Sequence, residues 1–370
     1  MLSTKNLILE PKKNPQPLSN SNKEAYRDLL LNNISTEPPE ELPKPKSNHI
    51  WKHISEIHDE AIQYIVDRRD GKIKSIKTPW SSFNDAGTGG LEWNNIITIS
   101  GVPGSGKTLI LNQITRNAHK LNPTEDFAVL DFQFEMTIKA TGIREFSSVV
   151  GKTYKELLSV DSKVSQDDLD KIWGHTKRSL GADIYQIETP LTVDQMESVI
   201  KQFIAEVKKP TIVTLDHSIL IKQGSGEKDK FESLYALGEK LTKLKKELPV
   251  MFIILTQMNR SIEDQVRKAP GTIGNYPTRA DIFGGESLMQ HSDIVIAINR
   301  PGIWMEVYGP EQFEVSDRIL ALHFLKTRNG DNMLCFFEAE FEHMNIREIP
   351  TPNRRQLKLR SGSRVTTGIP

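Results

Sequence analysis

The sequence Gly-Val-Pro-Gly-Ser-Gly-Lys-Thr at residues 101–108 matches the phosphate-binding loop pattern G-x-x-x-x-G-K-[ST]. Glycines in such a loop let backbone N–H groups turn inward around a polyphosphate, and the helix that follows adds the positive end of its dipole. We expect Lys107 to reach the β- and γ-phosphates of ATP and Thr108 to ligate Mg²⁺. The other loop residues predicted to contact the nucleotide are Gly101, Pro103, Gly104, Ser105 and Gly106.

The residues on either side of this loop have the periodicity that the motif requires. The apolar run at 95–100 predicts a buried strand, and residues 109–114 continue as an amphipathic helix. Strand, glycine loop and helix in this order are typical of nucleoside triphosphatases with a P-loop. The alternative is a glycine-rich turn in a Rossmann-like domain, which the flanking strand and helix disfavour.

Two acidic residues follow further apolar runs. The run at 211–215 ends at Asp216, which is the Walker B arrangement: a carboxylate at the sheet edge beside the phosphate loop, where it would hold Mg²⁺. The run at 127–132 is followed by Glu135, which could orient and deprotonate the attacking water. The alternatives are an acid that merely ends a strand and an acid that complements a helix dipole. Asp131 is a weaker competitor for the base, because strand alternation points it elsewhere.

Three further polar residues lie where strands are expected to end. Gln257 follows the run at 250–256 and could sense the γ-phosphate by hydrogen bonding, although glutamine is common at strand ends. Lys326 and Arg328 share one face of a strand and precede an Asn-Gly turn at 329–330. Paired cations could neutralise a γ-phosphate. The alternative is a charged hairpin edge that discourages aggregation.

These residues need a scaffold, and the apolar runs predict one. Short continuous apolar strands separated by amphipathic helices imply an α/β fold with a mostly parallel central sheet covered on both faces. The last two runs are close together and could form an antiparallel hairpin extension. Strands are expected at residues 96–100, 127–132, 184–187, 211–215, 250–256, 294–299, 319–325 and 334–338.

The composition excludes several classes of protein. Among 370 residues, 48 Lys and Arg balance 48 Asp and Glu, so a large uniform basic surface is not expected and any nucleic-acid contact must be local. The single cysteine, Cys335, rules out an internal disulfide framework and a cysteine-cluster zinc site, and its apolar neighbours predict a core position. No apolar run of about 18 residues occurs and the N-terminal one is too short for a signal peptide, so we expect a cytoplasmic protein without membrane contact.

Composition shifts along the chain predict four parts. Residues 1–50, rich in Pro, Asn, Ser, Lys and Glu, predict a disordered, low-complexity arm. Residues 51–71 predict a helix that could pack on a neighbouring subunit or, equally well, within its own chain. Residues 72–350 carry the α/β pattern. Residues 351–370 predict a basic disordered tail, which could also touch nucleic acid or an acidic partner.

Taken in order, these segments resemble the ATPase domain of DnaB-type replicative helicases, a branch of the RecA-like ATPases, over about residues 55–345. Phe132-Gln-Phe-Glu-Met136 with Arg144 resembles the family's S-L-E-M…R, and Leu255-Thr-Gln-Met-Asn-Arg-Ser261 resembles L-S-Q-L-N-R-S. The other similar segments are residues 79–91, which precede the first core strand, 215–221, similar to the Walker B strand, 281–293, similar to D-L-R-E-S-G-A-I-E-Q-D-A-D, and 326–330, similar to K-Q-R-N-G.

The resemblance implies a RecA-like P-loop core that acts as an ATP-driven replicative DNA helicase in a bacterial or phage-infected cell. It further implies a homo-hexameric ring that translocates 5′–3′ on single-stranded DNA and unwinds forked duplex. ATP would lie between subunits, with Arg144 near the nucleotide and Lys326 and Arg328 entering the next subunit's site. Residues 51–71 would be the linker helix that docks on a neighbour. The alternative is a RecA-like DNA-binding ATPase that acts in recombination, or as a loader or mediator, without unwinding.

Two departures from the family pattern affect partners and DNA contacts. Low-complexity residues stand where the family has an N-terminal helical domain that commonly contacts primase, so a primase or loader partner is left open and a compact viral or mobile-element version is plausible. The segment 282–286 reads I-F-G-G-E where the family has L-R-E-S-G, which aligns Phe283 with the expected arginine. Phe283 could stack on a base, but a core position is favoured. The residues that could contact DNA are the backbone N–H groups of Gly284 and Gly285 and the cations Lys268 and Arg279.

Overall fold

The computed structural model describes residues 51–161, 163–268, 275–283 and 285–355. The predicted low-complexity arm and the end of the predicted basic tail lie outside these residues. The chain divides into two compact units, Met1–Arg69 and Asp70–Pro370. The part of the chain that the structure describes contains no helix long and apolar enough to cross a membrane.

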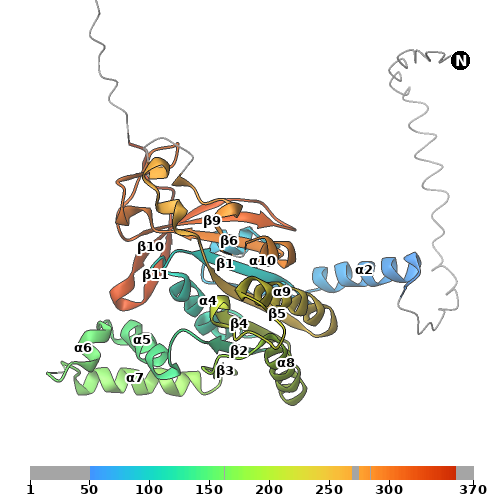
Figure 1. The fold of residues 1–370 in the computed structure, drawn as a ribbon. Coiled ribbons are helices and arrows are strands. Elements are labelled where there is room, and N and C mark those ends of the chain that lie inside the picture. The colour runs from blue at the N-terminus through green and yellow to red at the C-terminus, as the bar shows by residue number, and fades with distance from the viewer. Residues whose placement is uncertain (1–50, 162, 269–274, 284, 356–370) are drawn as a thin grey trace, which may run out of the picture. The chain divides into compact units, whose positions relative to one another are not determined.

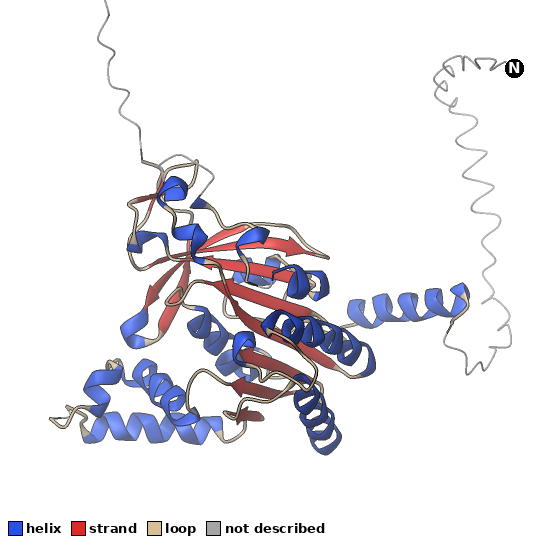
Figure 2. Cartoon of the chain, in the orientation of Figure 1, coloured by secondary structure: helices blue, strands red, loops and turns tan. Residues whose placement is uncertain are grey.

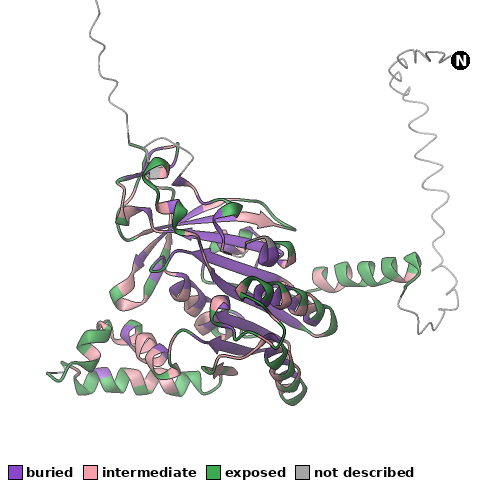
Figure 3. Ribbon diagram, in the orientation of Figure 1, coloured by how far each residue is buried: buried purple, intermediate pink, exposed green. Residues whose placement is uncertain are grey.

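In the first unit, the helix predicted over residues 51–71 is found as α2, Ile54–Arg69 (Figure 1). None of its residues is buried, and Figure 3 shows it as exposed or intermediate along its length. Ile54, Ile57, Ile62 and Ile65 are all exposed. A 16-residue helix is only marginally stable in water on its own. The apolar side chains of α2 are therefore exposed to solvent.

The second unit is built on one nine-stranded sheet, ordered β11-β10-β9-β6-β1-β5-β4-β2-β3 (Figures 1 and 2). The six strands from β6 to β3 are parallel, and β9, β10 and β11 continue the sheet in antiparallel pairs. The strands are β1 Ile96–Gly101, β2 Ala128–Gln133, β3 Ile184–Ile187, β4 Thr211–Asp216, β5 Val250–Gln257, β6 Ile294–Asn299, β9 Ile319–Thr327, β10 Leu334–Glu340 and β11 Asn345–Ile349.

All eight predicted strands are present within a few residues of their predicted bounds, and the predicted antiparallel hairpin is β9–β10. Three strands were not predicted. They are β11 and the two-stranded sheet of β7, Val307–Tyr308, and β8, Phe313–Glu314.

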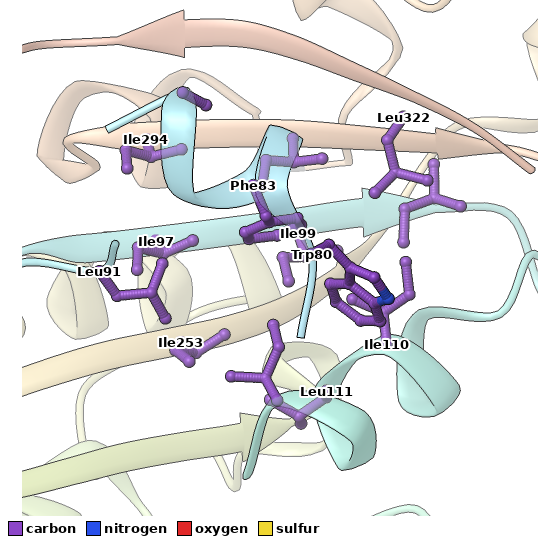
Figure 4. Close-up of a cluster of buried hydrophobic side chains, with 14 of the residues drawn as sticks. Trp80, Phe83, Leu91, Ile97, Ile99, Ile110, Leu111, Ile253, Ile294 and Leu322 are labelled. Carbon is purple, nitrogen blue, oxygen red and sulfur yellow. The ribbon is translucent and has the colours of Figure 1, made fainter. Parts of the chain in front are cut away.

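Helices cover both faces of the sheet because each parallel strand sends alternate side chains to opposite faces. Ile97 and Ile99 of β1 pack in one core cluster with side chains of α4, whereas Ile96 packs in a second core cluster with side chains of α8 and α9. Figure 4 shows the first cluster. The helices are α3 Ser81–Asp85, α4 Lys107–Leu121, α5 Ile138–Val150, α6 Tyr154–Leu158, α7 Gln166–Ser179, α8 Val193–Val207, α9 Lys230–Glu247 and α10 Gly285–His291.

The chain between β2 and β3 forms a small group of three helices, α5, α6 and α7. Thr153 and Ser165 begin α6 and α7 with reciprocal capping boxes, and the Thr137 hydroxyl caps α5. An ion pair between Arg116 of α4 and Glu145 of α5 links this group to the first core helix, with 3.3 Å between Nε and Oε2. Side chains of α5 and α6 also line the same cavity as the phosphate loop, so the group flanks that loop.

Candidate nucleotide-binding and catalytic site

The phosphate loop joins β1 to α4, and its glycines are needed for its shape. Gly104 and Gly106 have φ angles of 77° and 91°, in the left-handed region that glycine adopts without strain. A Cβ at Gly101 would overlap the Ser105 hydroxyl and lie 2.9 Å from the Ile298 carbonyl oxygen. Gly106 is the N-cap of α4, so the first N–H groups of that helix face the loop. The loop can therefore accept an anion.

Lys107 is held beneath the loop by backbone carbonyls. Its Nζ donates to Gly101 O at 2.9 Å and to Val102 O at 3.1 Å, and its side chain is buried. Burial lowers the pKa of this ammonium group, while the nearby carboxylates of Asp216 and Glu135 act in the opposite direction. A bound polyphosphate would supply the negative charge that favours the ammonium form.

Thr108 and Asp216 meet at the end of β4. The Thr108 hydroxyl donates to Asp216 Oδ2 at 2.8 Å. Burial raises the pKa of Asp216 to about 7; the Thr108 hydrogen bond opposes this, and the Glu135 and Asp131 carboxylates add to it. Among the described residues, Asp216 Oδ1 has no hydrogen-bond partner. A hydroxyl and a buried carboxylate with an unused oxygen fit the oxygen ligands that Mg²⁺ prefers.

Glu135 and Gln257 flank Asp216, and a histidine lies between them. The Glu135 side chain is about half exposed, and its Oε2 lies 3.7 Å from Nε2 of His217. The same ring nitrogen is 3.5 Å from Nε2 of Gln257. Burial lowers the pKa of His217, while the Glu135 carboxylate favours the charged form. His217 was not predicted; the available signal was a titratable residue directly after the Walker B acid.

Asp131 does not face this site. Its carboxylate is buried within the sheet, where Oδ1 accepts from the Thr214 hydroxyl at 2.5 Å. Gln133 Nε2 donates to both carboxylate oxygens at 3.1 and 3.0 Å, and Gln186 Nε2 donates to Oδ2 at 3.0 Å. Asp131 therefore does not line the cavity, as expected, but strand alternation is not the reason. It contacts Gln133 and Thr214, which lie on the same face of the sheet as Asp216, and these contacts occupy its carboxylate two residues before the strand ends.

A cavity of about 520 Å³ opens above the phosphate loop. This volume falls in the range of small-molecule sites in proteins. Phe341 lines it, and the Arg300 guanidinium lies 4.0 Å from the centre of the Phe341 ring. The predicted residues on its wall are Pro103, Gly104, Gly106, Lys107, Thr108, Glu135, Arg144 and Gln257, joined by the unpredicted Ser147, Thr153, Tyr154, Lys155, Phe341, Glu342 and Met344.

Lys326 and Arg328 lie at the other end of the parallel strands from the phosphate loop. The phosphate loop follows the carboxyl end of β1, which runs parallel to β6, whereas β9 is antiparallel to β6 and pairs Lys326 with Val295 near the start of that strand. A six-residue strand spans about 20 Å, so these cations are separated from their own phosphate loop by the length of the sheet. Arg328 lies one residue past the end of β9, beyond the strand face predicted for it.

The predicted DNA-contact residues lie between β5 and β6. Arg279 is exposed, and its Nη2 donates to Leu325 O at 3.1 Å. Phe283 is half-buried, packs against the core cluster that contains side chains of α8 and α9, and lies 5.1 Å from the exposed Phe231 ring. It therefore lies at the margin of the core and not within it. Lys268 ends a short 3-10 helix and Gly285 begins α10, while Gly284 lies outside the described residues.

Comparison with known proteins supports one family. Residues 75–345 match the family model of the DnaB-like helicase C terminal domain. The chain is 26% identical over 261 residues to the replicative DNA helicase DnaB of Buchnera aphidicola subsp. Schizaphis graminum, covering 69% of this chain and 53% of that protein. It is 27% identical over 300 residues to the DnaB of Geobacillus stearothermophilus, covering 78% and 60%. The chain therefore spans little more than half the length of these curated relatives.

Solved structures agree with this match at the level of the fold. One solved structure, described as an ATPase domain, superposes with a TM-score of 0.66 at 19% identity, covering 79% of this chain and 98% of that one. Another, described as a DnaB-like replicative helicase and its interactions with primase, gives a TM-score of 0.64 at 19% identity, covering 79% and 69%. The fold is that of the RecA-like ATPases, and the chain belongs to the DnaB-like helicase C-terminal domain family.

Proposed function

We propose that this protein is an ATP-driven DNA helicase that works as a hexameric ring on single-stranded DNA and unwinds duplex in the 5′–3′ direction. One observation supports the proposal beyond family membership. The candidate nucleotide site and the pair Lys326 and Arg328 lie at opposite ends of the parallel strands of one sheet. A subunit built in this way offers an ATP site at one end of its strands and cations at the other end. Such a subunit suits a head-to-tail ring, in which the ATP site of one copy faces the cations of the next copy.

The residues of the candidate nucleotide site have the chemistry of phosphoryl transfer. Lys107 and the loop N–H groups would hold the β- and γ-phosphates. Thr108 and Asp216 would hold Mg²⁺, which neutralises phosphate charge when it is bound. Glu135 would orient the attacking water and take its proton. Gln257 would contact the γ-phosphate.

A hydrogen bond joins the candidate nucleotide site to the segment proposed to contact DNA. The backbone N–H of Phe283 donates to Gln257 O at 2.9 Å, and Arg279 donates to Leu325 O, next to Lys326. A shift of Gln257 would therefore be transmitted to residues 279–285. We propose that the longer segment 264–286 grips one DNA strand through Lys268, Arg279, Gly284 and Gly285.

The apolar residues of α2 support assembly. Ile54, Ile57, Ile62 and Ile65 are exposed on a helix that buries none of its own residues. Burial of such side chains against another copy would contribute about 1.5–3 kcal/mol each. We propose that α2 docks on a neighbouring subunit of the ring. A primase or a helicase loader is a further candidate partner, as in the family.

The first test is ATP hydrolysis by the purified chain with and without single-stranded DNA, with Lys107→Ala as the blank. We expect DNA to stimulate turnover strongly and the Lys107→Ala variant to lose it, because the substitution removes the cation beneath the phosphates. A forked-duplex unwinding assay would follow. Turnover that ignores DNA would argue that residues 264–286 do not grip a strand. That result would favour a RecA-like ATPase that acts as a loader or recombination mediator.

Phe341 supplies a second prediction at the same site. Its ring lines the cavity and has one face against Arg300, so a nucleobase could stack only on the other face of the ring. Stacking of a base on an aromatic ring contributes about 1–3 kcal/mol. We therefore expect Phe341→Ala to raise the Kd for ATP about tenfold. Phe341→Tyr should bind ATP as the wild type does, and unchanged binding of ATP to Phe341→Ala would remove the residue from the base site.

A further inference from the structure

We propose that Asp293 is a positioning residue that orients Arg328 toward the active site of the next subunit. This inference rests on the proposed function, in which Arg328 acts in trans. Asp293 immediately precedes β6 and its side chain is 4% exposed. A carboxylate this deeply buried needs several donors to be stable. Its donors come from three separate parts of the fold.

The two oxygens of Asp293 have different partners. Oδ2 accepts from the backbone N–H of Ile96 at 2.8 Å and from Lys245 Nζ at 2.5 Å, which ties together the starts of β1 and β6 and the end of α9. Oδ1 lies 3.2 Å from Nη1 of Arg328. The main-chain oxygen of Asp293 also accepts from the backbone N–H of Arg328 at 2.9 Å. One residue thus holds Arg328 by both its backbone and its guanidinium group.

The turn that carries Arg328 is fixed independently of its side chain. The Thr327 hydroxyl donates to Gly330 O at 2.7 Å and closes the turn. A Cβ at Gly330 would overlap the Ala86 carbonyl, so the turn presses on the segment after α3. On the other side, Lys326 Nζ donates to Met289 O of α10 at 2.6 Å. The guanidinium group is the part of Arg328 that still has to be oriented.

The Arg328 side chain is 55% exposed, so packing leaves it several rotamers. The Asp293 contact selects one of them before a neighbour is met. Small misplacement of a group that acts in the transition state can lower a rate by about 10²-fold. Because Asp293 is buried at the base of the turn, it does not itself reach the next subunit's nucleotide. Its effect must pass through Arg328.

The test is Asp293→Asn in the full chain, with Lys245→Met as the matched control. The asparagine keeps one oxygen for the Ile96 N–H but loses the charge that pairs with Arg328. We expect kcat for ATP to fall about 10- to 100-fold, with the KM for ATP within threefold of wild type. Lys245→Met removes the other cation from the same carboxylate and should change kcat less than threefold, because Oδ1 and Arg328 are left in place.

A double variant separates positioning from mere structural support. If Asp293 acts through Arg328, Asp293→Asn adds no further loss of kcat in an Arg328→Ala background. A purely structural role would multiply the two losses, and that result would overturn the inference. Equal kcat losses in Asp293→Asn and Lys245→Met would overturn it too. If Asp293→Asn does not fold, Asp293→Glu, which keeps the charge and displaces it, takes its place in the same comparison.

Failure of the inference and failure of the proposed function give different results. If Arg328→Ala hydrolyses ATP as the wild type does, the trans role of Arg328 is wrong. If Arg328→Ala is inactive while Asp293→Asn is normal, only the positioning role of Asp293 is wrong. Mixed rings add a second readout: Asp293→Asn subunits should regain activity when mixed with Lys107→Ala subunits, since each supplies what the other lacks.

Discussion

A Glu135→Gln variant is expected to bind ATP with wild-type affinity and to hydrolyse it about 10²- to 10⁴-fold more slowly. Glu135 lies two residues past β2 on the wall of the cavity, beside Lys107 and the Asp216 carboxylate. A carboxylate there can take a proton from a water held near the γ-phosphate. A neutral amide of the same size cannot do so, although it can still accept a hydrogen bond.

The measurement is steady-state ATP hydrolysis together with equilibrium binding of ATP. Glu342→Gln is the matched control, because Glu342 lines the same cavity and its carboxylate instead pairs with Arg318 at 2.8 Å. We expect this control to keep turnover within threefold of wild type. Near-normal hydrolysis by Glu135→Gln would show that the base lies elsewhere. Loss of ATP binding in the same variant would point to a role in holding the nucleotide.

The parts of the fold that could be predicted from sequence are those specified locally. Five of the six parallel strands (all but β3) are buried along nearly their whole length because both of their faces are covered, and the largely apolar runs that result are visible without knowing their neighbours. In contrast, β11 reads Asn-Ile-Arg-Glu-Ile, is the outermost strand of the sheet and has only one buried residue, Ile346. The strands β7 and β8 have two residues each, too few to show a period.

The same distinction holds within the candidate site. Residues 101–108 and Asp216 were predicted because a phosphate loop and a strand-end acid have short patterns. Phe341 meets this loop only because β10 returns beside β9 and the chain then turns over Gly106. Asp293 meets Arg328 only through the antiparallel pairing of β6 with β9. Sheet order decides such contacts, and no local pattern in the sequence records it.

The position of Lys326 and Arg328 illustrates what the fold adds to a motif. Their types and spacing suggested cations for a γ-phosphate. The spacing could not show whether that phosphate is bound by the same subunit or by a neighbouring one. The antiparallel pairing of β9 with β6 places them at the end of the strands that is far from the phosphate loop of the same subunit. If these cations act on a γ-phosphate, as proposed, that separation means that the phosphate must belong to a second subunit.

Arg328→Ala should therefore retain ATP binding and lose turnover, by about 10³- to 10⁵-fold if it serves as an arginine finger. Arg347→Ala is the matched control: Arg347 is an exposed arginine on β11 that pairs with Glu338, and its removal should leave turnover within threefold of wild type. The measurement is steady-state ATP hydrolysis at a protein concentration where the wild-type ring is assembled. Normal turnover by Arg328→Ala would contradict the role.

Mixing Arg328→Ala with Lys107→Ala tests whether the arginine acts across an interface. Under the proposed arrangement, each variant alone lacks one half of every active site. In a randomly mixed head-to-tail ring at equal amounts, about a quarter of the interfaces join an intact phosphate loop to an intact Arg328. We expect the mixture to recover a measurable fraction of wild-type hydrolysis, rising with the time allowed for subunit exchange. Activity no greater than the sum of the two separate variants would mean that Arg328 does not serve a neighbour's site.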